Sequence, residues 1–121
     1  MWLLDTNVLI ECNKLETRPF KKGLTFTTIL SLIEFPIASK YDEISVIYPS
    51  SIHYEQSFKN AVLLREKGNP LPTIDILIGT ITVEKNLILV SNDIHFKSLQ
   101  KIEPRLKIIN SNVYIKNIQE L

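Results

Sequence analysis

The 121-residue chain contains one cysteine, Cys12, and two histidines, His53 and His95. A single cysteine excludes an internal disulfide bond and favours a reducing compartment. Structural zinc sites need clusters of cysteine and histidine, and the chain has no such cluster. Cys12 has no partner motif and lies in a predicted helix, so we expect it to be chemically inert. His95 lies just beyond Asp93 and could contact a substrate, although a surface position at the start of a helix is the commoner role.

Long apolar runs, repeats and strong net charge are also missing. No apolar run approaches the ~20 residues of a membrane span, and the N-terminus lacks the basic-then-apolar pattern of a secretion signal. The formal net charge is +1, so any contact with nucleic acid must be local. We therefore expect one globular domain over residues 1–121, soluble and cytoplasmic.

The chain does have short apolar segments that alternate with helical patterns, and this alternation is typical of a parallel sheet covered by helices on both faces. In such sheets the binding crevice lies beyond the carboxyl ends of the strands. The segments that read as strands are Trp2–Leu4, Leu24–Thr27, Ser45–Tyr48, Leu87–Val90 and Leu106–Ile109.

Helical spacing and turn residues predict the helices between these strands. One begins after Thr28 and must end or kink at Pro36, which lacks a backbone donor. Another, beginning at Ser50 or Ser51, runs to about Lys67 and carries Tyr54, Phe58, Ala61 and Val62 at helical spacing, with Gly68 just past its end. The remaining predicted helices are 7–15, 73–85, which should be buried nearly all round, and 94–101.

Four acids lie in unusual surroundings. Asp5 and Asp93 follow predicted strands, Asp75 lies in the first turn of the helix 73–85, and Glu34 lies between large apolar residues. Each has an ordinary interpretation: Asp5 and Asp93 could cap helices, Asp75 could interact with a helix dipole, and Glu34 could reach solvent or a lysine. Gly79, one turn after Asp75, would let the backbone approach a ligand or partner closely.

Taken together, the four acids favour a metal site. Several carboxylates projected toward one crevice would repel each other, and nothing in the local sequence supplies matching arginines. A divalent cation is their natural partner. An all-oxygen site suits Mg²⁺ or Mn²⁺, and four acids can hold one or two ions with coordination positions left for a substrate. Such sites activate water and stabilise the leaving oxygen in phosphodiester cleavage.

Four segments in the same order resemble the motifs of PIN-domain ribonucleases. They are Leu4-Asp5-Thr6-Asn7-Val8-Leu9-Ile10, the segment from Thr28 to Glu34, Pro72-Thr73-Ile74-Asp75-Ile76-Leu77-Ile78-Gly79, and Leu89-Val90-Ser91-Asn92-Asp93-Ile94-His95-Phe96. The domain size looks most like the VapC-type toxins of toxin–antitoxin pairs. The resemblance spans residues 1 to about 110, and it departs from the family where Ser91 replaces a common Thr and where Pro36 interrupts a helix.

The resemblance implies an α/β fold, a three-layer α/β/α sandwich around a parallel sheet of about five strands. It implies Mg²⁺- or Mn²⁺-dependent RNA cleavage, a homodimer, and inhibition by a small antitoxin. It makes Asp5, Glu34, Asp75 and Asp93 the catalytic and metal-binding residues. By the same resemblance, the hydroxyl groups of Thr6 and Ser91 orient acids or waters, and Asn7 is a weaker candidate for such a supporting role. The tail 111–121 carries no motif and could be an extra edge strand or a partner-binding segment.

Other protein classes need acids at positions where this chain has different residues, or they share its fold without its chemistry. An aspartate-nucleophile phosphatase needs a second Asp at the position of Asn7, and a receiver domain needs an Asp after the third strand, where the chain has Tyr48-Pro49-Ser50-Ser51. A non-catalytic RNA-binding or assembly module and a housekeeping RNA-processing nuclease are also compatible with the sequence. The apolar residues near Pro36, which are Phe20, Phe35, Ile37 and Tyr41, either pack inside the domain or form a dimer seam or antitoxin groove.

Overall fold

The structure is a computed structural model that describes residues 1–121. Its centre is a five-stranded sheet in the order β3-β2-β1-β4-β5, and every neighbouring pair is parallel. The strands are β1 (Trp2–Leu4), β2 (Thr25–Thr28), β3 (Ser45–Ile47), β4 (Ile88–Val90) and β5 (Lys107–Ile109). All five predicted strands are therefore present, and β1 is the central strand.

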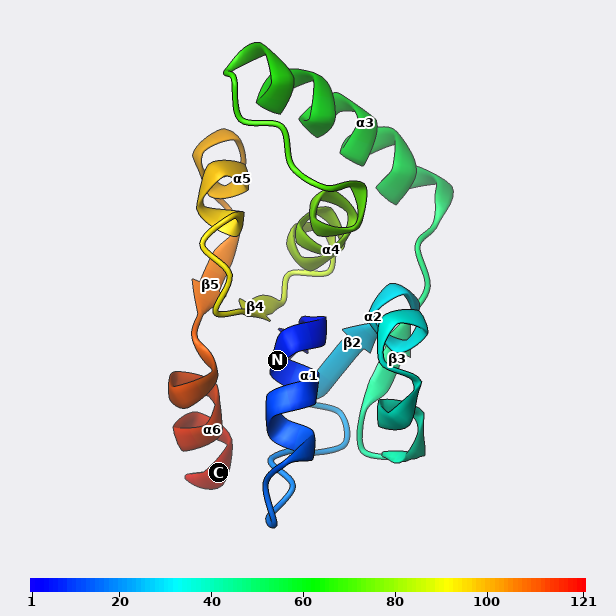
Figure 1. Cartoon of the computed structure of the whole chain (residues 1–121), viewed down its shortest axis with the longest axis vertical. Helices are drawn as coiled ribbons and strands as arrows, with labels where there is room; N and C mark the ends of the chain where they lie inside the picture. Colours follow the sequence, from blue (N-terminus) through cyan, green and yellow to red (C-terminus); the bar gives the residue numbers. More distant parts are fainter.

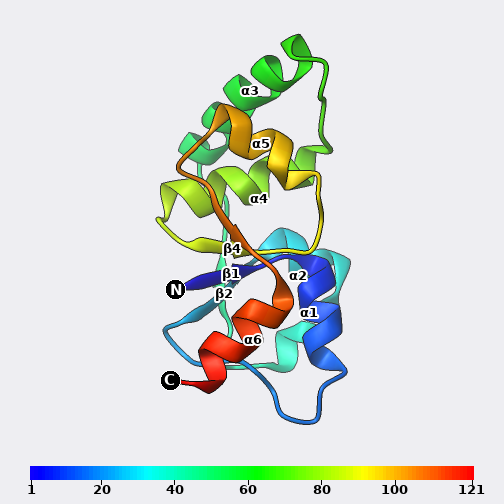
Figure 2. The same ribbon diagram turned by 90° about the vertical axis from the view of Figure 1, so that its left-hand side faces the viewer.

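Helices cover both faces of the sheet, which confirms the predicted α/β/α sandwich (Figures 1 and 2). Helices α3, α4 and α5 lie on one face, and α1, α2, the 3₁₀ helix η1 and α6 lie on the other. The bounds are α1 (Thr6–Asn13), α2 (Ile29–Glu34), η1 (Pro36–Lys40), α3 (Ser51–Glu66), α4 (Thr73–Glu84), α5 (Phe96–Ile102) and α6 (Ser111–Gln119). None of the helices combines the length and apolar character that crossing a membrane requires.

The strand order has one topological switch point, between β1 and β4. From β1 the chain moves outward to β2 and β3, and it then returns through α3 and α4 to place β4 on the other side of β1. Loops that leave the carboxyl ends of these two strands diverge to opposite faces, which opens a crevice between them. The residues that follow β1 and β4 therefore meet at one edge of the sheet.

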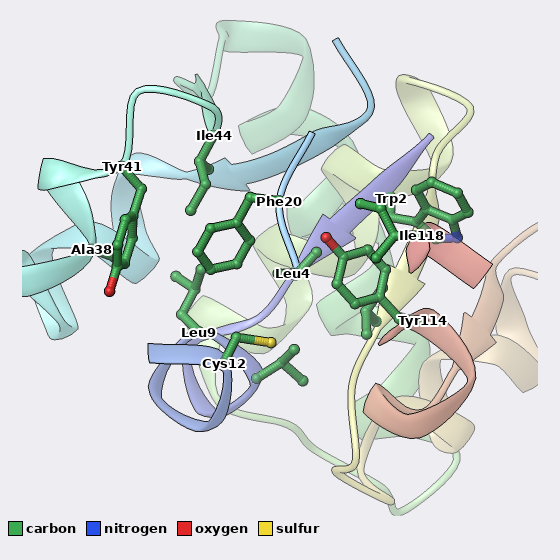
Figure 3. Packing of buried hydrophobic residues seen from close by; sticks show 12 residues of the cluster. Trp2, Leu4, Leu9, Cys12, Phe20, Ala38, Tyr41, Ile44, Tyr114 and Ile118 are labelled. Atoms are coloured by element: carbon green, nitrogen blue, oxygen red, sulfur yellow. The ribbon is translucent and has the colours of Figure 1, made fainter. Parts of the chain in front are cut away.

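Alternate side chains of the short strands belong to two separate hydrophobic cores. Leu4 faces the core under α1 and α6, where Trp2, Tyr114 and Ile118 also pack (Figure 3). Leu3 faces the other core, together with side chains of α3, α4 and α5. Because both faces are covered, β1 and β4 can be continuously apolar, as the sequence predicts.

Cys12 lies in the first of these cores and has no exposed surface (Figure 3). Burial raises the pKa of its thiol to about 12, so the reactive thiolate is not formed near neutral pH. Both observations agree with the prediction of an inert cysteine.

The tail is a helix, so the prediction of an extra edge strand is wrong. The Asn110 side chain caps α6 by accepting a hydrogen bond from the Val113 amide at 2.9 Å. Tyr114 and Ile118 are one helical turn apart, and both are buried in the core. The Tyr114 hydroxyl lies between the Thr25 hydroxyl and the Pro19 carbonyl, and it hydrogen-bonds both. This packing stabilises the helical conformation over an edge strand.

Helix α3 has an unusual arrangement of polarity. Its apolar stripe is largely at the surface: Tyr54, Phe58 and Val62 are 54%, 71% and 40% exposed. The face that packs on α4 carries polar side chains, among them Asn60, which donates a hydrogen bond to the Thr80 hydroxyl at 3.1 Å. The stripe that helical spacing identifies is therefore mainly the outer face of α3.

The segment around Pro36 divides into buried and exposed residues. Helix α2 ends at Glu34, and Pro36 begins the 3₁₀ helix η1, as the missing proline donor requires. Phe20 and Tyr41 are buried, with ring centroids 5.0 Å apart, whereas Ile37 is 53% exposed. Most of this cluster is thus internal packing, and only its outer part is available to a partner.

Candidate active site

The candidate site lies at the switch point, where Asp5 follows β1 and Ser91 follows β4. The two strands pair in register, with Leu4 opposite Val90, and the Asp5 amide donates to the Val90 carbonyl at 3.2 Å. The Ser91 hydroxyl donates to Asp5 Oδ2 at 2.5 Å. The sheet register therefore determines which hydroxyl meets the Asp5 carboxylate.

Asp5 caps a helix and also faces the other acids. Its Oδ1 accepts the Val8 amide at 3.0 Å, which satisfies one of the free donors at the start of α1. The residue is 6% exposed. Burial raises the pKa of the Asp5 carboxyl, and the charges of Asp93 and Glu34 raise it further, while the hydrogen bonds from Ser91 and Val8 act in the opposite direction.

Asp93 and Asp75 come to the site from two different elements. Asp93 lies in the loop after β4, where its amide donates to the Ser91 hydroxyl at 3.0 Å. Asp75 lies in the first turn of α4, on the helix that crosses the sheet above the switch point (Figure 2). Burial, followed by the charge of Asp93, raises the pKa of the Asp75 carboxyl, and the charges of Asp5 and Glu34 add to this shift.

Glu34 is the last residue of α2, and it reaches the site although α2 is short. The Thr6 hydroxyl donates to Glu34 Oε1 at 2.8 Å, which links the first turn of α1 to the end of α2. The Glu34 charge contributes to the raised pKa values of both Asp5 and Asp75. Pro36 ends the helix directly after Glu34 without turning the side chain away from the other acids.

Two residues that the sequence singled out lie apart from these contacts. Asn7 is exposed in the first turn of α1 and makes no side-chain hydrogen bond to the acids. Gly79 is buried, and a Cβ atom there would lie 2.1 Å from Leu99 Cδ2 and 3.8 Å from Leu106 Cδ2. The prediction that Gly79 admits a ligand or partner is therefore wrong: it admits the close packing of α5 against α4.

Two features of the site lie beyond what sequence reasoning identified. Asn92 joins the loop after β4 to two helices, because its amide donates to Ser111 Oγ at 3.0 Å and to Glu11 Oε2 at 3.2 Å. His95, which the sequence favoured as an ordinary surface residue, lies beside the acids, with Nδ1 3.3 Å from Asp93 Oδ1 and 4.0 Å from Asp75 Oδ2. Only the position of His95 close to Asp93 in the sequence hinted at this contact.

The donor set fits a divalent cation. No lysine or arginine forms an ion pair with any of the four acids, and the one neighbouring base is His95. Ligand atoms of Asp75, Asp93 and His95 all lie within 4.8 Å of one another. Carboxylates that converge without a permanent cation are strongly repulsive unless they are protonated or bind metal. Burial is the main cause of the raised pKa values of Asp5 and Asp75, and the charges of the neighbouring acids add to it.

A parallel α/β/α sandwich with an acidic crevice at its switch point is thus the class of protein that the structure defines. No family model and no curated protein matches the chain. A chain of VapBC2 from Rickettsia felis, solved bound to a DNA fragment from the promoter, is similar with a TM-score of 0.68 and 22% identity over 90% of this chain and 97% of that chain. A chain of VapBC-1 from nontypeable Haemophilus influenzae is similar with a TM-score of 0.71 and 17% identity, over 92% of this chain and 98% of the other.

These comparisons show the fold. The five-stranded parallel sheet and its helices share the fold of these two chains of VapBC complexes, over most of the chain. The resemblance that the four sequence motifs carried is therefore confirmed as a shared fold.

Proposed function

We propose that residues 1–121 form a metal-dependent ribonuclease domain that hydrolyses single-stranded RNA, the toxin of a type II toxin–antitoxin pair acting in the cytoplasm. One observation carries the proposal: four carboxylates from four segments of the chain converge at the switch point without a lysine or arginine to neutralise them. The shared fold with chains of VapBC complexes supports it.

Asp5, Asp75, Asp93 and Glu34 would hold one or two Mg²⁺ or Mn²⁺ ions. When bound, such an ion lowers the pKa of a water molecule and stabilises the leaving oxygen of a phosphodiester. Ser91 orients Asp5 through the hydroxyl hydrogen bond, and Thr6 does the same for Glu34. Glu34 is exposed, which suits either a metal ligand or a base that positions the attacking water.

A cleft beside the acids suits the RNA strand. It has a volume of about 390 Å³ and runs from Ser91 and Asp93 along α5 and β5, where Lys97 and Ile108 line it. A lysine at this place can neutralise a backbone phosphate, and the partly exposed isoleucine offers contact to a base. In this proposal Lys97 positions the strand, and the acids act on the phosphate at the mouth of the cleft.

We also propose two partners. A second copy of the chain would cover the exposed apolar stripe of α3, which includes Tyr54 and Phe58. An antitoxin segment would cover Ile33 and Ile37, which are 70% and 53% exposed on either side of Glu34 and Pro36. From there a basic side chain of the antitoxin can reach the acids and inhibit by charge pairing.

The proposal is tested by incubating the purified protein with single-stranded RNA and Mn²⁺, with excess chelator as the control. Cleavage that needs the metal supports the nuclease, whereas binding of RNA without cleavage supports a non-catalytic RNA-binding module. Expression of the chain with and without the neighbouring small reading frame then separates a toxin from a housekeeping nuclease. A protein that is harmless alone and binds no neighbour would refute the toxin assignment and leave the nuclease chemistry unaffected.

A further inference from the structure

His95 is held over two of the acids by the turn that precedes α5. Its backbone amide donates to Asp93 Oδ1 at 2.9 Å, and this bond closes a short turn between the end of β4 and the helix. The His95 side chain is 56% exposed, so the ring is not needed to fill the core. Its place is determined by the turn and by the two carboxylates it faces.

The separations between these groups are close to those of ligands around one ion. Nδ1 of His95 lies 3.3 Å from Asp93 Oδ1 and 4.0 Å from Asp75 Oδ2, and the three ligand atoms fit within 4.8 Å. In an octahedral site with ligand distances of about 2.1 Å, neighbouring ligands are about 3 Å apart and opposite ligands about 4 Å apart. Small rotations of partly exposed side chains suffice to bring the three onto one ion.

We propose that His95 is a nitrogen ligand of one ion, which it binds together with Asp75 and Asp93, and that it gives the site a preference for Mn²⁺ over Mg²⁺. Imidazole nitrogen binds transition metals well, whereas Mg²⁺ takes oxygen ligands and keeps several waters. Removing the imidazole therefore weakens Mn²⁺ binding much more than Mg²⁺ binding. This inference rests on the proposed metal-dependent function.

The competing role for His95 is that of a counter-charge. A protonated ring near two carboxylates is attracted to them whether or not a metal binds, and the nearby His95 charge does lower the pKa of Asp75. The two roles differ in one observable property. A ligand has its nitrogen bonded to the ion, whereas a counter-charge is displaced when a divalent cation arrives.

Electron spin-echo envelope modulation of the Mn²⁺-loaded protein distinguishes the two roles. We expect modulation from a directly bonded imidazole ¹⁴N in the wild-type protein and its loss in His95→Gln. Bound Mn²⁺ without nitrogen coupling would overturn the assignment of His95 and leave the proposed nuclease standing. A protein that binds no Mn²⁺ at all would overturn the metal-dependent function itself.

Calorimetric titration with Mn²⁺ and with Mg²⁺ provides the second measurement. We expect His95→Gln and His95→Ala to lose about 10-fold or more in Mn²⁺ affinity, with a change of less than about 2-fold for Mg²⁺. Lys101→Ala, in the last turn of the same helix, is the matched control and should change neither. Equal losses for the two ions would show that His95 acts through charge alone and would overturn the proposed preference.

Discussion

Replacing Asp5 by asparagine separates the two roles of this side chain. Asp5 Oδ1 caps α1 through the Val8 amide, and the carboxylate as a whole is a buried negative charge among other acids. Asparagine is as good an N-cap as aspartate, so Asp5→Asn keeps the cap and removes the charge. Asp5→Ala removes both, so the difference between the two variants reports the cap together with the side-chain contact to Ser91.

The expected sizes follow from these contacts. Loss of the cap costs about 1 kcal/mol of unfolding free energy. For 121 residues at about 2.1 cal/mol/K per residue, 1 kcal/mol corresponds to a shift in Tm of roughly 4 °C. Metal-free Asp5→Asn should therefore melt no lower than the wild-type protein, because it relieves burial of charge and repulsion, and Asp5→Ala should melt roughly 4 °C below Asp5→Asn.

The assay combines calorimetric melting in chelator with cleavage of single-stranded RNA in Mn²⁺. RNA cleavage should be abolished in Asp5→Asn, Asp75→Asn and Asp93→Asn, and Glu34→Gln should be milder if Glu34 only positions water. An Asp5→Asn protein with full activity would refute the assignment of Asp5 as a metal ligand. An Asp5→Asn protein that fails to fold would refute the claim that the charge is dispensable for stability.

Three further outcomes are expected. Mn²⁺ at 100 times its Kd should stabilise the wild-type protein by about 2.7 kcal/mol. A Tm that does not change in millimolar Mn²⁺ would indicate that the acids have a structural role instead. In chelator, the unfolding free energy should decrease as pH rises from 3.8 through the raised pKa values of Asp5 and Asp75. The reason is that above pH 3.8, the pKa of the unfolded chain, the native state holds more protons than the unfolded state. Calorimetry across this range should show a shallower decrease for Asp5→Asn than for the wild-type protein. Phe58→Glu should weaken the proposed homodimer in sedimentation analysis, whereas Asn117→Glu, which adds the same charge on the exposed face of α6, should not.

Much of the fold follows from local sequence. Short apolar runs such as Trp2–Leu4 are strands because both faces of a parallel sheet are buried, and Pro36 ends α2 because proline has no amide to donate. The positions of Asp5 and Asp93 shortly after β1 and β4 also place them at one sheet edge without any knowledge of tertiary contacts. These features depend on residue type and spacing along a single segment.

Other features depend on which segments meet in space. Spacing alone identifies the apolar stripe of α3, but only the packing of the polar face of α3 against α4 leaves Phe58 at the surface. Three contacts join residues from different elements: Gly79 lies against Leu99, Tyr114 of α6 bonds to Thr25 of β2, and His95 approaches Asp75. Sequence periodicity determines the faces that an element has, and the tertiary structure decides what each face contacts, because contacts between distant segments depend on the whole topology.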